Sequence, residues 1–368
     1  MSKHKAAILS IDSSHITVLI GSRSVNNTFS ISGAGEAVYD GYTNGEFVEP
    51  RKLADSVLEA FDAVKSQSNP IDKIFVGVPA DFLECLIKDV NLSFPRPKAI
   101  KPSDIDRLFD EGATVLSREY KLINRSPVYF EADGLKTLKY PKSKTSKISA
   151  KVSYIYAKKV FIEIINAILE TAGISDAIYL GSPLCQYLYL IEDKAAEKKS
   201  VILDIGHIAS SVVCAQGEGI TSLQNFASGS GFLTVILMEG LDITYSQAET
   251  LKQQLVLTLD PSDNERYIID EYSAAVSAKK ANELVIEGLY NMAETIAENI
   301  EKAAIHFDEY TSVYLTGGEI CNMRGAKDIF EKVLGTSIEI LKPSVPMLDK
   351  PQFSQIAGLL DLALTHTK

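Results

Sequence analysis

Two stretches half a chain apart decide the fold: Ala6-Ala7-Ile8-Leu9-Ser10-Ile11-Asp12 and Ser200-Val201-Ile202-Leu203-Asp204. Each is an apolar, β-rich run that ends in an aspartate, and each is followed after a short polar turn by a second such run, at 16–21 and 210–214. Such runs predict buried strands joined as hairpins. A repeat separated by half the chain, and not by the period of about 20–50 residues of a solenoid, predicts two similar lobes.

Helical and strand patterns alternate along the rest of each half. Apolar residues at helical spacing predict helices, and short apolar runs bounded by Pro, Gly or polar residues predict strands. This alternation predicts an α/β protein with crossover connections. Two unrelated hairpins are the alternative to a true repeat, because a strand that ends in Asp and turns is common. The predicted helices span 51–66, 103–117, 160–172, 282–304 and 351–363, and the predicted strands span 73–79, 151–156, 312–316 and 337–341.

The composition is that of an ordinary globular protein with an acidic balance. Of 368 residues, 46% are hydrophobic, and 37 Lys and Arg against 48 Asp and Glu give a formal net charge of −11. The length predicts two domains or one bilobed unit with a sizeable core. The negative balance argues against nucleic-acid or anionic-membrane binding driven by electrostatics. For the basic, polar stretch 141–147 we expect a solvated hairpin tip and not a phosphate or nucleic-acid site.

The sequence indicates neither a metal centre built on histidine or cysteine nor a membrane span. The four cysteines form no CxxC pair and the five histidines no HExxH motif, so we expect buried thiols in a reducing compartment. No apolar run reaches about 18 residues, the length that a membrane-spanning helix needs. These features predict a soluble, cytoplasmic protein. The cysteines are Cys85, Cys185, Cys214 and Cys321.

Three turns have the features of a site for a nucleoside triphosphate. Backbone N–H groups must approach the phosphate oxygens, which favours Gly and small residues in the turn, and the accompanying Mg²⁺ takes carboxylates, usually through water. Asp12 and Asp204, at strand ends of facing lobes, are the predicted magnesium ligands, acting through water. The residues predicted to hold the phosphates are Ser13, Ser14, Gly206 and Ser210, with Ser211 as a further hydroxyl donor.

The adenosine part of the ligand is predicted at Gly317-Gly318, because a strand–Gly-Gly–helix arrangement lets the backbone approach a ring closely. Glu249 and Lys252 lie three residues apart, so they share one face of a helix. Such a pair can hold ribose hydroxyls and the adenine edge. From the spacing alone, a surface ion pair is the favoured interpretation.

At these residues the sequence resembles the actin/Hsp70/sugar-kinase ATPases and, within them, the bacterial cell-division family FtsA. Asp12-Ser13-Ser14 stands where the family has its first phosphate turn, Asp-Ile-Gly-Thr, and Asp204-Ile205-Gly206 opens the second, Asp-Ile-Gly-Gly-Gly-Thr-Thr-Asp. Leu315-Thr316-Gly317-Gly318 is similar to the adenosine motif, and Ala248-Glu249-x-x-Lys252 to the family's Ala-Glu-x-x-Lys helix. The resemblance covers residues 6 to 364 in order. It implies a two-lobed actin-like (ribonuclease H-like) α/β fold.

The resemblance also implies a division of the chain. The segment Ile100-x-x-Ser103-Asp104-Ile105 is similar to the opening of an extra subdomain that is characteristic of FtsA. The implied parts are a first-lobe core at 1–84, the extra FtsA-type subdomain at 85–157, the returning first lobe at 158–198, the second-lobe core at 199–238, its upper subdomain at 239–305, and the second-lobe core with the closing helix at 306–368.

The sequence departs from the family at the phosphate turns. Ser14 replaces the glycine of the first turn, and His207 and Ile208 replace two glycines of the second. Side chains at these positions keep the backbone N–H groups farther from a phosphate than glycine would. Residues 181–184, where relatives often carry an acid or amide that orients the attacking water, offer only Ser182. We therefore expect ATP and Mg²⁺ as ligands, with weak or absent hydrolysis.

The resemblance implies a cell-division scaffold that self-associates into filaments and recruits the tubulin-like protein FtsZ through its second lobe, at the division site on the inner face of the membrane. A PilM-like platform protein of type IV pilus assembly is the alternative, which Ser210-Ser211 without an Asp favours. A small-molecule kinase of the same fold is a third hypothesis, but it needs an intact phosphate turn and a catalytic acid. FtsA proteins usually continue into a membrane-targeting helix, whereas this sequence ends at Lys368, so we expect either another membrane tether or a longer natural chain. Residues 353–364 fit a core helix, and we expect no direct membrane anchor among the residues given.

Overall fold

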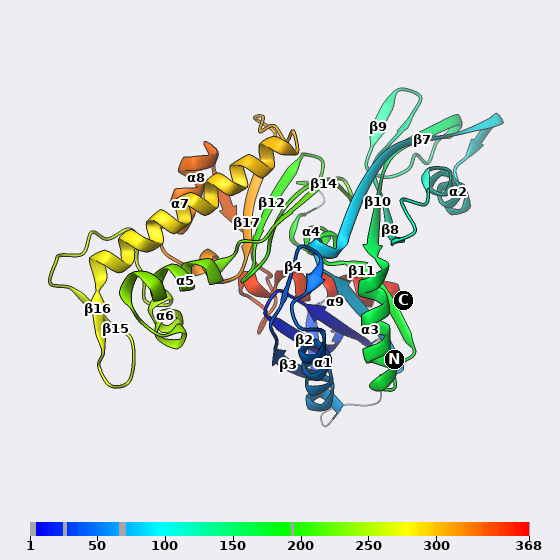
Figure 1. The fold of residues 1–368 in the computed structure, drawn as a ribbon. Helices are drawn as coiled ribbons and strands as arrows, with labels where there is room; N and C mark the ends of the chain where they lie inside the picture. Colours follow the sequence, from blue (N-terminus) through cyan, green and yellow to red (C-terminus); the bar gives the residue numbers. More distant parts are fainter. Residues whose placement is uncertain (1–4, 25–27, 66–70, 193–194, 368) are drawn as a thin grey trace.

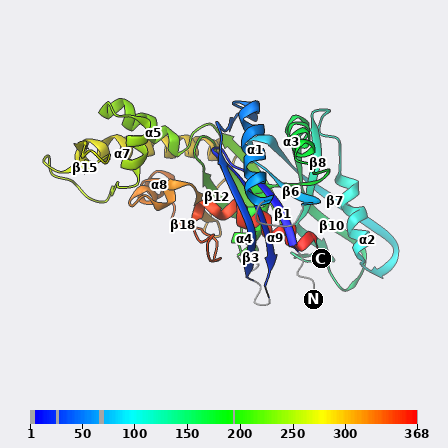
Figure 2. The same ribbon diagram turned by 90° about the horizontal axis from the view of Figure 1, so that it is seen from below.

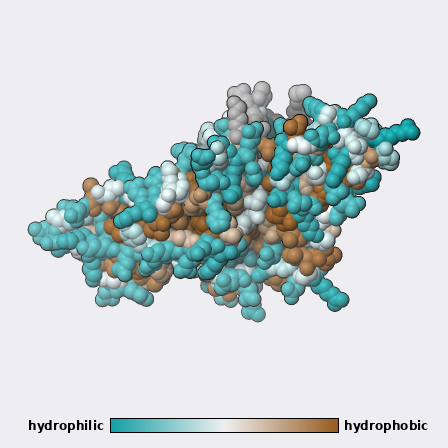
Figure 3. Space-filling model, turned by 90° about the horizontal axis from the view of Figure 1, so that it is seen from above, coloured by the Kyte–Doolittle hydropathy of each residue, from teal (hydrophilic) through white to brown (hydrophobic). Residues whose placement is uncertain are grey.

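The fold is described for residues 5–24, 28–65, 71–192 and 195–367 of a computed structural model (Figure 1). Three larger sheets organise the molecule, one in each lobe and one beside them. Figures 1 and 2 show an elongated shape, with the sheet of β7–β10 at one end and the β15–β16 hairpin at the other. On the face that Figure 3 shows, hydrophilic side chains cover most of both ends, and hydrophobic ones gather toward the middle.

The first sheet is built on the N-terminal hairpin. Its order is β11-β6-β1-β2-β3; β1, β6 and β11 run parallel, and β1-β2-β3 is an antiparallel meander. β1 is buried on both faces, since Leu9 lies in one core with α1 and α3, and Ile8 in another with α9. Its nearly continuous apolar sequence is typical of such a strand. The elements are β1 (Lys5–Ile11), β2 (His15–Arg23), β3 (Phe29–Val38), α1 (Pro50–Lys65), β6 (Lys73–Val78), α3 (Lys159–Thr171), β11 (Asp176–Gly181) and α4 (Ser182–Leu190).

The second sheet repeats the first. Its order, β18-β17-β12-β13-β14, places a hairpin, a third antiparallel strand and two parallel strands in the same succession, which confirms two similar lobes. Val201 and Leu203 pack in the core with α5 and α7, whereas Ile202 faces the core that the second lobe shares with the first. The elements are β12 (Ser200–Ile205), β13 (Ser210–Gln216), β14 (Gly219–Phe226), β17 (Ser312–Gly317), η2 (Glu319–Asn322), α8 (Ala326–Leu334) and β18 (Ile338–Ile340).

The upper part of the second lobe is mostly helical. The 25-residue helix α7 packs against α5 and α8, and α5 packs against α6. The N-terminus of α7 is capped by Ser277, whose hydroxyl accepts the Lys280 N–H at 3.3 Å. The elements are α5 (Ser230–Leu241), α6 (Tyr245–Lys252), β15 (Arg266–Ile268), β16 (Ala275–Ser277) and α7 (Ala278–Lys302).

A third sheet, of order β7-β10-β8-β9, carries helix α2 on one face. The prediction of a helix at 103–117 is wrong at both ends, because α2 spans Pro102–Gly112. Lys101 is the N-cap, and Asp104 in the first turn accepts its backbone N–H at 3.0 Å. The sheet touches the second lobe, where β7 and β8 lie beside β14. The elements are β7 (Leu83–Ala99), α2 (Pro102–Gly112), β8 (Tyr120–Ala132), β9 (Leu135–Thr137) and β10 (Lys144–Lys158).

The closing helix α9 (Ser354–His366) returns from the second lobe to cover the first sheet. Its buried side chains include Leu359 and Leu360, which confirms the predicted core role. Among the described residues, no helix is long and apolar enough to cross a membrane. Three of the four thiols are buried as expected, and Cys85, at the β7–β14 contact, is partly exposed. The remaining short elements are β4 (Tyr42–Thr43), β5 (Glu46–Phe47), η1 (Ala80–Phe82) and η3 (Pro351–Phe353).

Candidate functional site

A cavity of about 600 Å³ lies between the two lobes, at the ends of their central strands. The turns β1–β2, β12–β13 and β17–η2 all contribute to its wall, so Asp12 and Asp204 face the same space. Nine of the ten main predicted site residues line it, as does the further hydroxyl donor Ser211, and Lys252 lies behind the wall. The nine are Asp12, Ser13, Ser14, Asp204, Gly206, Ser210, Glu249, Gly317 and Gly318.

The first turn is held by the carboxylate of Asp12. Its Oδ1 accepts the backbone N–H of Ser14 at 2.7 Å and that of His15 at 2.6 Å, which closes a tight turn of the kind Asp favours. The Ser14 hydroxyl lies 2.8 Å from His15 Nδ1, within the same turn. The hydroxyl of Tyr39 donates to the Asp12 carbonyl at 2.5 Å. Two backbone N–H groups of this turn, those of Ser14 and His15, are therefore bonded to Asp12 and not to a ligand.

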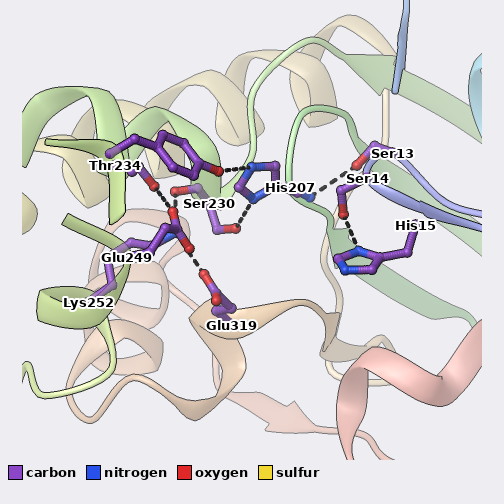
Figure 4. A network of polar contacts seen from close by, with 10 residues as sticks. Ser13, Ser14, His15, His207, Ser230, Thr234, Glu249, Lys252 and Glu319 are labelled. Carbon is purple, nitrogen blue, oxygen red and sulfur yellow. Dashed lines mark hydrogen bonds and ion pairs between the residues drawn. The ribbon is translucent and has the colours of Figure 1, made fainter. Parts of the chain in front are cut away.

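Ser13 joins the first turn to the second. Its Oγ accepts the backbone N–H of His207 across the boundary between the lobes, at 3.1 Å (Figure 4). It accepts the backbone N–H of Ile208 at the same distance. Ile208 also reaches the first lobe, because a Cβ on Gly41 would lie 2.6 Å from its Cδ1. The lobes are thus tied directly to each other at the place where phosphates are predicted to bind.

Asp204 is buried and held by two amides. Gln186 on α4 donates from Nε2 to Asp204 Oδ2 at 3.0 Å, and Gln355 on α9 donates to the same oxygen at 2.7 Å. Burial raises the pKa of Asp204, and the nearby Asp12 carboxylate acts in the same direction, although the two amide bonds oppose them. The acidic end of the first central strand is therefore close enough to act on the acidic end of the second.

The sequence analysis missed Gln186, which is a cavity-lining amide one helical turn beyond Ser182. The signal for it was the spacing of four residues on α4, which places both side chains on one helix face. The Oε1 atoms of Gln186 and Gln355 are buried without a hydrogen-bond partner in the described structure. These acceptors beside Asp204 are suited to a hydrated cation. Within the described chain, however, no three His, Cys, Asp or Glu side chains are grouped so as to hold a metal ion.

The third turn packs against the second. Gly317 has φ +102°, and a Cβ there would lie 2.4 Å from Asp204 Oδ1, so only glycine fits. The Gly318 N–H donates to the Ile205 carbonyl at 2.6 Å. The sequence predicted that the backbone at Gly317 and Gly318 would lie close to a ligand ring. In the structure, the Asp204 carboxylate occupies part of the space beside Gly317.

Lys252 is buried, so the interpretation of Glu249 and Lys252 as a surface ion pair is wrong. Lys252 is 4% exposed and its Nζ lies 2.8 Å from Glu249 Oε1 and 2.7 Å from Glu319 Oε2 (Figure 4). Thr234 donates to the same Glu249 oxygen at 2.5 Å. Because η2 supplies Glu319, the lysine links α6 to the segment that follows the third turn. Spacing within one helix could not show this second carboxylate, which comes from a distant part of the chain.

His207 fills part of the wall between the second turn and the helices above it. Its Nδ1 lies 3.3 Å from the Ser230 hydroxyl and its Nε2 lies 3.2 Å from the Tyr245 hydroxyl. Burial lowers the pKa of His207, and the positive charge of Lys252 lowers it further. The ring therefore favours its neutral form, with one nitrogen donating and the other accepting.

The cavity is acidic. Within the described part of the chain, seven carboxylate residues line it and neither Lys nor Arg does. A polyphosphate is repelled by such a wall unless a cation accompanies it. The seven are Asp12, Glu36, Asp40, Asp81, Asp204, Glu249 and Glu319.

Comparison with known proteins gives relatives over the whole chain, although no protein-family model matches it. FtsA of Bacillus subtilis (strain 168) is 22% identical over 373 residues, covering 98% of this chain and 83% of the relative. FtsA of Staphylococcus epidermidis is 20% identical over 379 residues, covering 99% and 80%. Among solved structures, the PilM–PilN type IV pilus biogenesis complex matches with a TM-score of 0.64 and 15% identity over 98% of both chains. MreB5 of Spiroplasma citri bound to ADP matches with a TM-score of 0.58 and 10% identity over 99% of this chain and 98% of that one.

The repeated lobes around a shared cavity, together with these structural matches, define an actin-like protein. Since the FtsA sequences match along nearly its full length, the chain is a divergent FtsA-like actin homologue.

Proposed function

We propose that the protein is an FtsA-like scaffold of bacterial cell division that binds a magnesium–nucleotide complex between its lobes. The observation that carries this proposal is the full-length similarity to FtsA combined with a cavity that nine of the ten predicted residues line. The proposal includes the division of the chain set out above, with 85–157 as an FtsA-type subdomain, and places the protein at the division site through its partners.

The cavity supports a nucleotide ligand on chemical grounds. Its volume of about 600 Å³ is within the usual range of ligand sites. Three turns from two lobes surround it, and MreB5, which has the same fold, has been solved with ADP and with AMPPNP. The acidic wall supports binding of the nucleotide only together with Mg²⁺, which Asp12 and Asp204 hold through water while the phosphates supply direct ligands.

Hydrolysis is proposed to be weak or absent. Gln186, the amide of the cavity wall that the sequence analysis missed, donates from Nε2 to Asp204, and this bond fixes the orientation of the amide. The phosphate oxygens must also displace Ser13 Oγ from the amides of His207 and Ile208 before they can bind there. Both features favour a nucleotide that is bound and retained over one that is turned over.

The proposed partner is an FtsZ-like division protein, which contacts the upper part of the second lobe. Three large apolar side chains are exposed around the β15–β16 hairpin: Leu259 at 61%, Ile268 at 57% and Tyr272 at 85%. Exposed apolar side chains that gather at one place favour a protein contact. Self-association of the actin-like chains is the other interaction that the proposal includes.

A PilM-like role in a pilus assembly platform is the second candidate. The match to the PilM–PilN complex over 98% of both chains favours it, as does the Ser210-Ser211 pair in the second turn.

Fluorescence anisotropy with two labelled peptides separates these candidates. One peptide is the C-terminal segment of the FtsZ from the same organism, and the other is the N-terminal segment of its PilN-like protein. We expect saturable binding of the FtsZ peptide, which Ile268→Asp weakens and Val115→Asp, at a site that is 84% exposed in the 85–157 region, does not. Binding of the PilN-like peptide alone would assign the pilus role instead.

A further inference from the structure

Tyr42, on β4, is a buried tyrosine whose hydroxyl has no partner in the described structure. The side chain is 6% exposed and lines the cavity between the lobes. Its hydroxyl makes no hydrogen bond among the described residues, and it is not one of the unpartnered polar atoms that are shut off from accessible space. Buried tyrosine hydroxyls usually find a hydrogen-bond partner. The free hydroxyl of Tyr42 therefore indicates a partner atom within the cavity.

The ring of Tyr42 is fixed by aromatic packing and by the backbone before it. Its centroid lies 5.3 Å from that of Phe82 and 6.4 Å from that of Phe47, edge to face in both pairs. Gly41 has φ +81°, and the Ser13 carbonyl lies so close to it that no Cβ fits between them. The hydroxyl therefore has a defined position beside the first phosphate turn.

The turn between β4 and β5 is held as well. The Lys158 ammonium, at the end of β10, donates to the carbonyls of Asn44 and Gly45 at 3.4 Å each. The Asp81 carboxylate accepts the backbone N–H groups of the same two residues. A donor that is already in place loses little entropy when a ligand binds to it. Tyr42 is therefore preorganised as a hydrogen-bond donor.

Contacts in the cavity wall lead from the second lobe to the first. Figure 4 shows His207 between Ser13 on one side and the cluster that contains Glu249 on the other. The next residue, Ile208, reaches the first lobe, because a Cβ on Gly41 would lie 2.6 Å from its Cδ1. The strand β4, which follows Gly41, therefore stands beyond the meeting point of the two phosphate turns, on the side away from Glu249.

This order directs the terminal phosphate of a nucleotide toward Tyr42. The ribose and adenine are predicted at Glu249 and Gly317, and the phosphates at the two turns between them and β4. A row of phosphates that starts at the ribose therefore ends on the first-lobe side. Within the described chain neither Lys nor Arg lines the cavity, so the phosphate oxygens depend on neutral donors and on the metal ion.

The hydroxyl of Tyr42 is a donor and not an anion. Burial raises its pKa most, and four neighbouring ionisable groups raise the pKa further. A phenol with a raised pKa keeps its proton at neutral pH, so it can donate a hydrogen bond to a phosphate oxygen. A hydrogen bond to an ionised acceptor is stronger than one between neutral groups. The four groups are Tyr39, Asp81, Asp12 and Asp204.

We propose that Tyr42 donates its hydroxyl to the terminal phosphate of a nucleoside triphosphate and thereby makes the cavity prefer a triphosphate over a diphosphate. The inference rests on the proposed function, since the nucleotide must bind between the lobes, and it adds a residue that belongs to none of the three turns. A diphosphate is shorter by one phosphoryl group, so it leaves the Tyr42 hydroxyl without its partner. The preference follows from one hydrogen bond that only the longer ligand makes.

Calorimetric titration of the full chain with magnesium and either AMPPNP or ADP tests this role. Tyr42→Phe keeps the aromatic packing and removes only the hydroxyl. We expect it to weaken AMPPNP binding roughly 10- to 100-fold and to change ADP binding less than twofold. The matched control is Tyr314→Phe, since Tyr314 is 8% exposed, makes no hydroxyl hydrogen bond in the described structure and does not line the cavity. We expect this control to leave both affinities unchanged.

Thermal melts without nucleotide give a second readout. Because the Tyr42 hydroxyl has no protein partner, we expect Tyr42→Phe to melt no lower than the unmodified chain. Equal weakening of AMPPNP and ADP, no weakening of either, or the same selective loss in Tyr314→Phe overturns the role of Tyr42, and so does a clearly lowered melting temperature. If the unmodified chain binds neither nucleotide at millimolar concentration, the proposed function itself fails and this inference with it.

Discussion

Replacement of Ser13 by alanine tests how the lobes are held together. The change removes the one side-chain oxygen that accepts the N–H groups of both His207 and Ile208, at 3.1 Å each. A hydrogen bond contributes about 0.5–1.5 kcal/mol net, so two bonds contribute about 1–3 kcal/mol to closure of the lobes without ligand. A bound phosphate must displace this hydroxyl oxygen, and the same free energy therefore opposes nucleotide binding.

We expect Ser13→Ala to lower the free energy of unfolding by about 1–3 kcal/mol and to tighten nucleotide binding by roughly 5- to 150-fold. Urea unfolding measures the first effect, and calorimetric titration with magnesium and AMPPNP, which is not hydrolysed, measures the second. Ser14→Ala is the matched control, since the Ser14 hydroxyl bonds only to Asp12 and His15 within its own turn in the described structure. No gain in affinity for Ser13→Ala, or an equal gain for Ser14→Ala, refutes the reasoning.

Three further changes have defined outcomes. Lys252→Met leaves two partly buried carboxylates without their shared cation, and chemical denaturation should show a loss of about 2–4 kcal/mol; an unchanged midpoint would show that the pairs contribute nothing. Gly317→Ala, at φ +102° and against the Asp204 carboxylate, should lower the free energy of unfolding by about 2–4 kcal/mol. Gly335→Ala, at φ +64° in open space, should lower it by about 1 kcal/mol. Equal losses in the two variants would contradict the close contact between Gly317 and Asp204. Burial raises the pKa of the Asp204 carboxyl group, so the folded chain binds the proton of this group more strongly than the unfolded chain does. The free energy of unfolding therefore falls as the pH rises from about 4 to the raised pKa. Asp204→Asn should remove this part of the pH dependence in thermal melts between about pH 4 and pH 8, and an unchanged profile would assign it to other groups.

The repeat of the two hairpins was enough to predict the architecture. Leu9 and Ile202 lie in apolar runs that end in Asp, and the structure places both runs at the centre of sheets with the same strand order. This prediction succeeded because a strand buried on both faces leaves a continuous apolar signal in the sequence. The boundaries of α2 were harder to predict, since the cap is a lysine whose backbone Asp104 bonds, and lysine gives no N-cap signal.

The candidate site could be predicted only where its residues follow strand ends. Asp12, Asp204 and Gly317 stand at such positions, and all three line the cavity. Gln186 and Gln355 could not be found in this way, because they come from helices that reach Asp204 from separate parts of the chain. No local pattern encodes a contact between residues that are more than a hundred positions apart, as for Gln355 and Asp204.

The contacts made by residues in the two divergent phosphate turns could not be predicted from the sequence either. Ser13 is predicted to donate to a phosphate, and the sequence did not show that its hydroxyl oxygen also accepts the amides of the opposite turn. His207 was expected to narrow the site, and its ring contacts the hydroxyls of Ser230 and Tyr245 from the facing helices. Both outcomes depend on the distance between the lobes, which only the folded structure defines.

Equilibrium dialysis with labelled ATP tests most directly whether the two acidic turns form one ligand site. With magnesium present, we predict one nucleotide per chain, lost on chelation of the metal and lost in both Asp12→Ala and Asp204→Ala. No uptake at millimolar ATP, or uptake that neither substitution affects, would contradict it.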